Sequence, residues 1–113
     1  AAFLRGGEVP SVKQSLTDVP HDAFKVLLAH QPHLVLRASE FDVGLQLSGH
    51  THGGIVLGLN YLVARYNSGF VSGLYRVGGT ALYVSNGSGI WNGFPVRLGV
   101  PSEITILKLM REK

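Results

Sequence analysis

Apolar residues in this chain fall into short runs that alternate with turn-forming residues. The segments 24–29 (FKVLLA) and 43–48 (VGLQLS) are two such runs, each with the length of a buried strand. Between them, apolar positions recur at spacings of four and three, which predicts a helix over residues 32–42 that begins at a proline. A strand, a helix and a second strand in close succession indicate two parallel strands joined by a crossover.

The second part of the chain has the pattern of a hairpin followed by a last strand. The runs GFVSGLYRV (69–77) and TALYVSN (80–86) flank Gly78–Gly79, a pair suited to a two-residue turn. The segment 103–109 (EITILKL) predicts the final strand, and because both of its faces are largely apolar, both sides of its sheet are expected to be covered. A short helix is expected within residues 11–20.

Composition agrees with one folded α/β domain containing a mixed sheet. The 113 residues suffice for one core, and 45% hydrophobic with 15% charged residues is typical of a globular chain. No apolar run is long enough to span a membrane, and none has the form of a signal peptide. The chain has no cysteine, which excludes disulfides and thiolate-held metals and leaves the compartment open.

The positive charge does not indicate a nucleic-acid partner. Ten lysines and arginines against seven acidic residues give a net charge of +3. These basic residues are scattered singly along the sequence, whereas a polyanion track requires them in clusters. We therefore expect no nucleic acid as a structural partner.

Three of the five histidines follow directly after the ends of predicted parallel strands. His30 comes after the first strand, and His50 and His52 lie in the glycine-rich turn after the second. Parallel strands end at one edge of their sheet, about 4.8 Å apart, so these imidazoles are expected to converge where ligands of such sheets collect. Convergent neutral imidazoles favour a metal ion, and His30, His50 and His52 are the predicted ligands. His21 and His33 are expected to be solvated.

Other interpretations of the same residues stay open. The three histidines can form a self-contained site for one ion with water in the fourth position, which would make the chain a small metal-binding module. They can also be incidental residues of a non-catalytic interaction domain. The loop 85–89 (SNGSG) offers backbone N–H groups to an anion, although such a stretch is more often a plain loop. None of the seven acidic residues stands in a motif beside the histidines, so the cluster looks incomplete.

Two stretches together resemble a known family. VLLAHQPHL (26–34), followed by LQLSGHTHGG (45–54), resembles the C-terminal half of the calcineurin-like metallophosphoesterases. The ending LYVSNGSGIWNGFPVRLGVPSEITILKL (82–109) is similar to a bacterial subgroup that often carries an N-terminal membrane anchor. The resemblance extends from about residue 24 to residue 109.

The resemblance implies a fold, a pair of metals and a reaction. The fold is a four-layer αββα sandwich in which helices enclose two sheets. Two divalent ions, drawn from manganese, iron, zinc and nickel, lie side by side; His30 and His50 match ligands of one ion, and His52 matches a ligand of the other. A hydroxide that bridges the ions attacks phosphomonoesters or phosphodiesters, so the implied activity is that of a hydrolase.

The family also needs motifs that this sequence lacks, namely aspartate-x-histidine, glycine-aspartate and glycine-asparagine-histidine. Residues 1–113 are therefore expected to be the C-terminal portion of a single metallophosphoesterase domain, inactive without the N-terminal half. Catalytic and substrate-binding residues are expected in that half, which becomes a partner alongside the phosphoester substrate. The protein is expected to be cytoplasmic, or membrane-associated through a segment outside this chain. Because half a sandwich exposes an apolar face, self-association is also expected.

Overall fold

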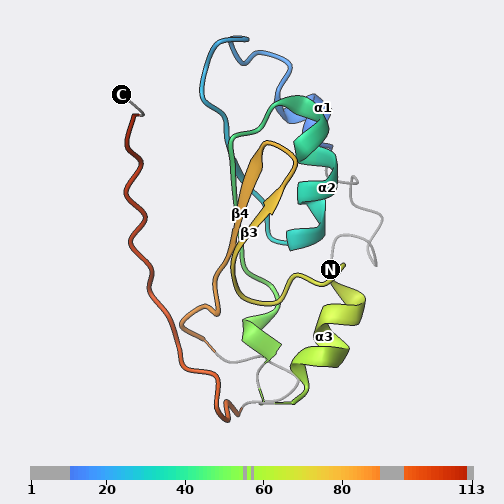
Figure 1. The fold of residues 1–113 in the computed structure, drawn as a ribbon, viewed down its shortest axis with the longest axis vertical. Coiled ribbons are helices and arrows are strands. Elements are labelled where there is room, and N and C mark those ends of the chain that lie inside the picture. The colour runs from blue at the N-terminus through green and yellow to red at the C-terminus, as the bar shows by residue number, and fades with distance from the viewer. Residues whose placement is uncertain (1–10, 55, 57, 90–95, 112–113) are drawn as a thin grey trace.

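The computed structural model describes residues 11–54, 56, 58–89 and 96–111 (Figure 1). Its elements in chain order are α1 (Val12–Ser15), β1 (Val26–Leu28), α2 (Val35–Ala38), β2 (Leu45–Ser48), α3 (Asn60–Tyr66), β3 (Gly73–Val77) and β4 (Thr80–Val84). Short 3-10 turns flank α2 at Pro32–Leu34 and Ser39–Phe41, and a further one follows β2 at His52–Gly54. The predicted helix over residues 32–42 is thus a chain of three short helical segments.

Four strands form one mixed sheet in the order β1-β2-β4-β3. β1, β2 and β4 are parallel, and β3 runs antiparallel to β4 across the Gly78–Gly79 turn. The predicted α/β class, the strand–helix–strand unit, the hairpin and the short helix before residue 20 are confirmed. The described residues form this one sheet, and the second sheet of the expected four-layer sandwich is not among them.

The core lies between the sheet and the helices on one of its faces. Val35 of α2 is fully buried against Leu82 and Val84 of β4, and Ala38 packs with Val12 and Val43 in a second cluster. Each such side chain contributes roughly 1.5–3 kcal/mol when fully buried. α2 is therefore held to the sheet by packing, and its short segments need no strong helix propensity of their own.

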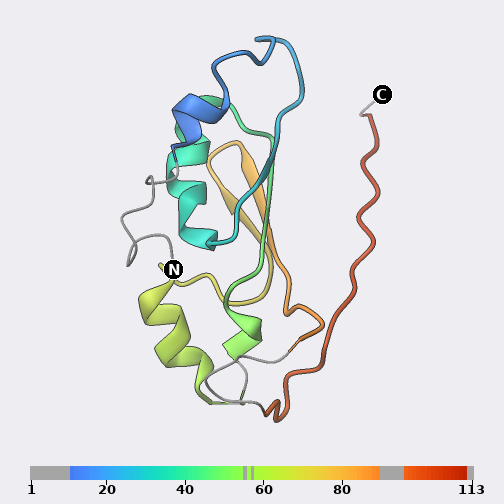
Figure 2. The same ribbon diagram turned by 180° about the vertical axis from the view of Figure 1, so that it is seen from behind.

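The opposite face of the sheet is apolar and largely uncovered. Directly paired residues share a face, and the face away from α2 carries the following side chains, here called the open face: Val26, Leu28, Leu45, Leu47, Leu74, Arg76, Ala81 and Tyr83. Leu28 and Leu74 are 76% and 72% exposed. Both ribbon views place α1 and α2 on one side of the sheet and the C-terminal segment on the other (Figures 1 and 2).

The prediction of a final strand at residues 103–109 is wrong for this structure. The segment is extended but pairs with no strand among the described residues, and it runs beside the open face rather than along a sheet edge (Figure 2). Its expected coverage is also wrong, because Ile104 and Ile106 are 90% and 93% exposed. A strand requires a neighbouring backbone for its hydrogen bonds, and apolar alternation alone does not supply one.

α3 was not anticipated from the sequence. Its residues, NYLVARY, contain apolar or aromatic side chains on every side, and none of them is buried. Its N-terminal residue is preceded by Leu59, which offers no side-chain cap. The usual start signal and an amphipathic stripe are therefore both missing.

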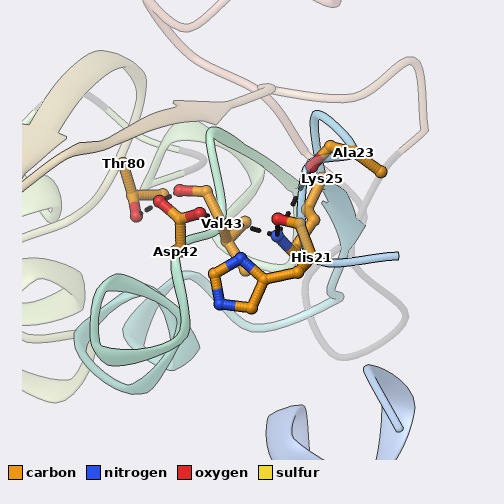
Figure 3. A network of polar contacts seen from close by, with 6 residues as sticks. All are labelled: His21, Ala23, Lys25, Asp42, Val43 and Thr80. Atoms are coloured by element: carbon orange, nitrogen blue, oxygen red, sulfur yellow. Dashed lines mark hydrogen bonds and ion pairs between the residues drawn. The ribbon is translucent and has the colours of Figure 1, made fainter. Parts of the chain in front are cut away.

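A polar network closes the edge of the sheet at which the parallel strands begin (Figure 3). The Lys25 ammonium, almost fully buried, donates to two backbone carbonyls of the preceding loop and forms an ion pair with Asp42 at 3.5 Å. Thr80 at the start of β4 donates its hydroxyl to the Val43 carbonyl at 2.6 Å. These contacts satisfy the buried polar groups of that edge and fix the register of the three parallel strands.

Candidate functional site

His30 and His50 meet at the opposite edge, where the parallel strands end. Nε2 of His30 lies 3.0 Å from Nδ1 of His50. The ring centroids are 4.7 Å apart and the rings stand edge to face at 72°. Two residues separated by 20 positions in the sequence are thus in direct contact because β1 and β2 are parallel neighbours.

Backbone hydrogen bonds beyond the strands hold this pair in place. The Ala29 N–H donates to the Leu47 carbonyl at 3.0 Å, and the Gly49 N–H donates to the His30 carbonyl at 3.3 Å. The buried Gln46 carboxamide donates to the carbonyl of Pro32 at 3.2 Å, which fixes the chain just after His30. The hydrogen bonding between β1 and β2 therefore continues past the strand ends as far as His30.

The turn after β2 holds both of its histidines in the left-handed backbone region. φ is 69° at His50 and 49° at His52. Residues with a side chain rarely adopt this conformation, which costs of order 1–3 kcal/mol per residue, and such residues cluster at functional sites. The turn therefore holds these two histidines in a backbone conformation that lowers the stability of the folded chain.

The two glycines that follow are required by space as well as by conformation. A Cβ on Gly53 would lie 2.4 Å from Oδ1 of Asn86, and one on Gly54 would lie 2.9 Å from Cα of Asn60. φ is positive at both glycines. The sequence HGG thus lets the turn pack closely against the loop after β4 and the start of α3.

The electrostatic surroundings keep the His50 imidazole neutral. Burial and then repulsion from the neighbouring imidazoles lower the pKa of His50 below that of a free histidine; the neighbours are His30, His52 and His33. A neutral imidazole retains the nitrogen lone pair that metal coordination requires. The lowered pKa of His50 therefore favours the form of the imidazole that can bind a cation.

His52 lies beside the pair without joining it. Among the described residues its Nδ1 is buried and has no hydrogen-bond partner. A buried donor or acceptor without a partner costs about 1–3 kcal/mol, and such groups in native structures call for an explanation, such as a role in binding an ion.

A cavity of about 260 Å³ opens next to these histidines. α3 and the histidine turn enclose it together. Its lining residues are His50, Thr51, His52, Leu62, Val63, Tyr66 and Asn67. The part contributed by α3 is the component of the site that the sequence pattern did not reveal.

Carboxylates do not complete the site within the described residues. No three His, Asp or Glu side chains there form a group able to hold an ion. Asp42 lies at the opposite sheet edge with Lys25, and the Glu103 carboxylate accepts hydrogen bonds from Tyr83, Thr105 and the Asn86 N–H. His30 and His50 are thus brought together, whereas the role of all three histidines as ligands stays a prediction.

The remaining sequence candidates do not join the imidazole pair. His21 is exposed at the edge where the strands begin, as predicted. His33 lies half-buried in the 3-10 turn before α2, near enough to His50 to contribute to its lowered pKa. In the loop 85–89, the Asn86 N–H donates to Glu103 and the Gly87 N–H donates to the Ser85 hydroxyl. Two amides that an anion would need are therefore already engaged by the chain's own groups.

The paired imidazoles fit the requirements of a shared ion. Two nitrogens bound to one tetrahedral ion at about 2.0–2.1 Å lie about 3.3–3.4 Å apart, so the His30–His50 separation of 3.0 Å would widen slightly on binding. Imidazole is also the ligand type that zinc, iron and nickel accept readily. The donor set, the neutral state of His50 and the buried unpartnered nitrogen of His52 all agree with divalent metal chemistry.

An α/β fold with paired imidazoles beyond the ends of two parallel strands defines a class of proteins whose ligands bind at that sheet edge. Comparison with known proteins then identifies a family within this class. The chain is 43% identical over its whole length to an uncharacterized metallophosphoesterase of Campylobacter jejuni, of which it spans 30%. It is 34% identical over 88% of its length to an uncharacterized metallophosphoesterase of Bacillus subtilis, of which it spans 36%.

A third relative is named a transmembrane protein with metallophosphoesterase domain, from Danio rerio; it is 40% identical over 91% of the chain, which spans 24% of that protein. The chain belongs to the metallophosphoesterases and corresponds to the C-terminal part of these relatives, about a third of their length or less. No family model and no solved structure matches it. Among the described residues, no helix combines the length and apolarity that crossing a membrane demands.

Proposed function

We propose that the polypeptide carrying this chain hydrolyses phosphomonoesters or phosphodiesters with two divalent ions. In this proposal His30 and His50 hold one ion and His52 holds the other. The observation that carries it is the 3.0 Å contact between the imidazoles of His30 and His50 at the end of two parallel strands. The family's name agrees with a metal-dependent phosphoesterase. The number of metal ions and the class of substrate are part of what we propose.

When bound, divalent ions neutralise phosphoryl oxygens and lower the pKa of water, which supplies a nucleophile at neutral pH. The residues of this chain supply the setting for that chemistry. The strand ends and Gln46 fix His30, the left-handed turn fixes His50 and His52, and the surroundings of His50 lower its pKa. Carboxylate ligands and groups that act on the substrate are expected from the part of the relatives that this chain does not span.

This division of ligands predicts weak metal binding by residues 1–113 alone. The reason is that imidazoles without a bridging carboxylate leave each ion short of ligands. In the longer polypeptide that includes the rest of the length seen in its relatives, we expect two equivalents of manganese or zinc, a melting temperature that rises with added metal, and hydrolysis of bis(4-nitrophenyl) phosphate. His50→Ala should lower all three, to near the level of chelator-treated protein.

The matched control is His21→Ala, because His21 is exposed at the far edge of the sheet. It should leave metal content, melting temperature and rate unchanged. One tightly bound ion per isolated 113-residue chain would instead favour the self-contained site for a single ion. Metal content that is insensitive to His50→Ala in the longer polypeptide would contradict the ligand assignment.

A further inference from the structure

The floor of the cavity beside the histidines holds two polar side chains that are anchored within the chain. Thr51 is buried and donates its hydroxyl to the Val71 carbonyl. Asn67 is also buried and donates one carboxamide N–H to the Val63 carbonyl at 2.9 Å. Asn67 keeps a second N–H and its amide oxygen. The polar part of the lining is nevertheless small, and most of the cavity surface is apolar.

The wall of the cavity is apolar and faces solvent. Leu62 and Tyr66 of α3 line it from the side opposite the histidine turn. Both side chains are more than half exposed, which is unusual for large apolar residues at one place unless a ligand or partner covers them. His50 and His52 form the other side, so an apolar surface and the candidate ligands share one space.

We propose that this cavity takes an apolar or aromatic ester group of the phosphoester, while the phosphate lies at the histidines. This inference rests on the proposed function and names its substrate class. The position of the cavity indicates its occupant, because one space is bounded by the candidate ligands His50 and His52 and by the apolar side chains of Leu62 and Tyr66. A volume of about 260 Å³ is slightly below the range of about 300–1,000 Å³ typical of small-molecule sites. It therefore suits one ring or a short alkyl chain rather than a whole nucleotide.

The test compares phosphodiesters that share a leaving group and differ only in the second ester. Metal-loaded longer polypeptide is assayed with methyl 4-nitrophenyl phosphate and hexyl 4-nitrophenyl phosphate. We expect kcat/KM to be about tenfold higher for the hexyl ester, less than its five extra methylenes would give in a closed apolar pocket, because this pocket is open on one side. Tyr66→Ala should reduce this preference by about threefold or more.

Tyr61→Ala is the matched control, because it removes the same side chain from the same helix. Tyr61 and Tyr66 are 81% and 84% exposed, and only Tyr66 lines the cavity. Tyr61→Ala should keep the hexyl preference, Tyr66→Phe should restore it, and Leu62→Ala should reduce it as an independent second variant.

The outcomes separate the two proposals. Hydrolysis of both esters at equal efficiency, or a preference that Tyr66→Ala and Leu62→Ala leave intact, overturns the cavity assignment and leaves the phosphoesterase proposal standing. Failure of the metal-loaded protein to hydrolyse either ester overturns the phosphodiesterase form of the proposed function, and with it the cavity assignment that rests on it. A preference lost equally in Tyr61→Ala also contradicts the assignment, because the effect would then belong to the helix as a whole.

Discussion

At the scale of single residues, His50 combines a costly backbone with a useful side chain. Its φ of 69° lies in a region that L-residues avoid, and its imidazole is 3.0 Å from that of His30. A glycine would adopt the same backbone without strain. The presence of histidine there agrees with the proposed ligand role of His50.

This conflict leads to a prediction that separates strain from ligation. His50→Gly removes the imidazole and the strain, whereas His50→Ala removes the imidazole alone. In metal-free protein we expect the free energy of unfolding of His50→Gly to exceed that of His50→Ala by about 1 kcal/mol, the usual cost of a left-handed residue with a side chain. Denaturant titration monitored by circular dichroism measures it. Equal stability of the two variants would show that the turn is not strained at this residue.

The contact between His30 and His50 could be foreseen because it depends only on two strands being parallel neighbours. The position of His52 could not, since it depends on left-handed backbone angles and on the close approach of Gly53 to Asn86. Turn geometry of this kind is set by packing between distant segments. The hydrophobic periods of strands (two residues) and helices (3.6 residues) do not predict such turn geometry.

At the scale of elements, the segment 103–111 is fastened to the sheet at its beginning. The Glu103 carboxylate accepts hydrogen bonds from the Tyr83 hydroxyl of β4 and from the Asn86 N–H. Hydrogen bonds from Thr105 and then from Tyr83 lower the pKa of Glu103. This carboxylate therefore favours its ionised form more in the folded protein than in the unfolded chain.

The sign of this shift fixes a pH dependence. Because the folded pKa of Glu103 is depressed, the stabilisation from this contact is complete above the ordinary glutamate pKa and is lost as the pH falls through the lowered folded value. The Asn86 N–H donates to that carboxylate at 3.2 Å. The NMR chemical shift of its amide proton should therefore follow the titration of Glu103, with a midpoint below the ordinary glutamate range. In Glu103→Gln this titration step should vanish. A midpoint at or above the ordinary value would contradict the observed contacts.

The elements that the sequence predicted and those that it did not differ in what holds them. α2, β2 and β4 bury residues of their own, and the half-buried Leu27 of β1 and Tyr75 of β3 pack against the core clusters, so their patterns carry the signal. α3 buries none of its residues, and the segment 103–109 has apolar side chains but no neighbouring strand among the described residues. An apolar run indicates a buried strand only when the covering layer is present.

At the scale of the whole molecule, the open face is an apolar surface that the described residues leave largely uncovered. It is an apolar sheet surface whose Leu28 and Leu74 are mostly exposed, with a second apolar surface on the extended segment beside it. Soluble monomers rarely leave such large apolar patches uncovered. The expected four-layer sandwich would cover this face, and that arrangement stays a prediction.

We expect residues 1–113 alone to self-associate through the open face. Leu74→Glu places a charge on the exposed β3 side of this surface and should shift the chain toward monomer in sedimentation velocity at high concentration. Leu36→Glu, an exposed position on α2 on the other side of the sheet, should leave association unchanged. A clean monomer of the unaltered chain at the same concentration would contradict the expectation.

The strand order β1-β2-β4-β3 also bears on when the site comes into being during folding. Two units are local in sequence, the β1–α2–β2 crossover and the β3–β4 hairpin, and only the β2–β4 pairing closes a long loop. Every residue that lines the cavity lies in that loop, between the end of β2 and the start of β3. Loop closure costs chain entropy before it yields contacts, so we expect this pairing to be the slower step of assembly. The imidazole pair and the cavity are therefore expected to form at different stages, because the His30–His50 contact needs only the first unit, whereas the cavity lies in the loop that the β2–β4 pairing closes.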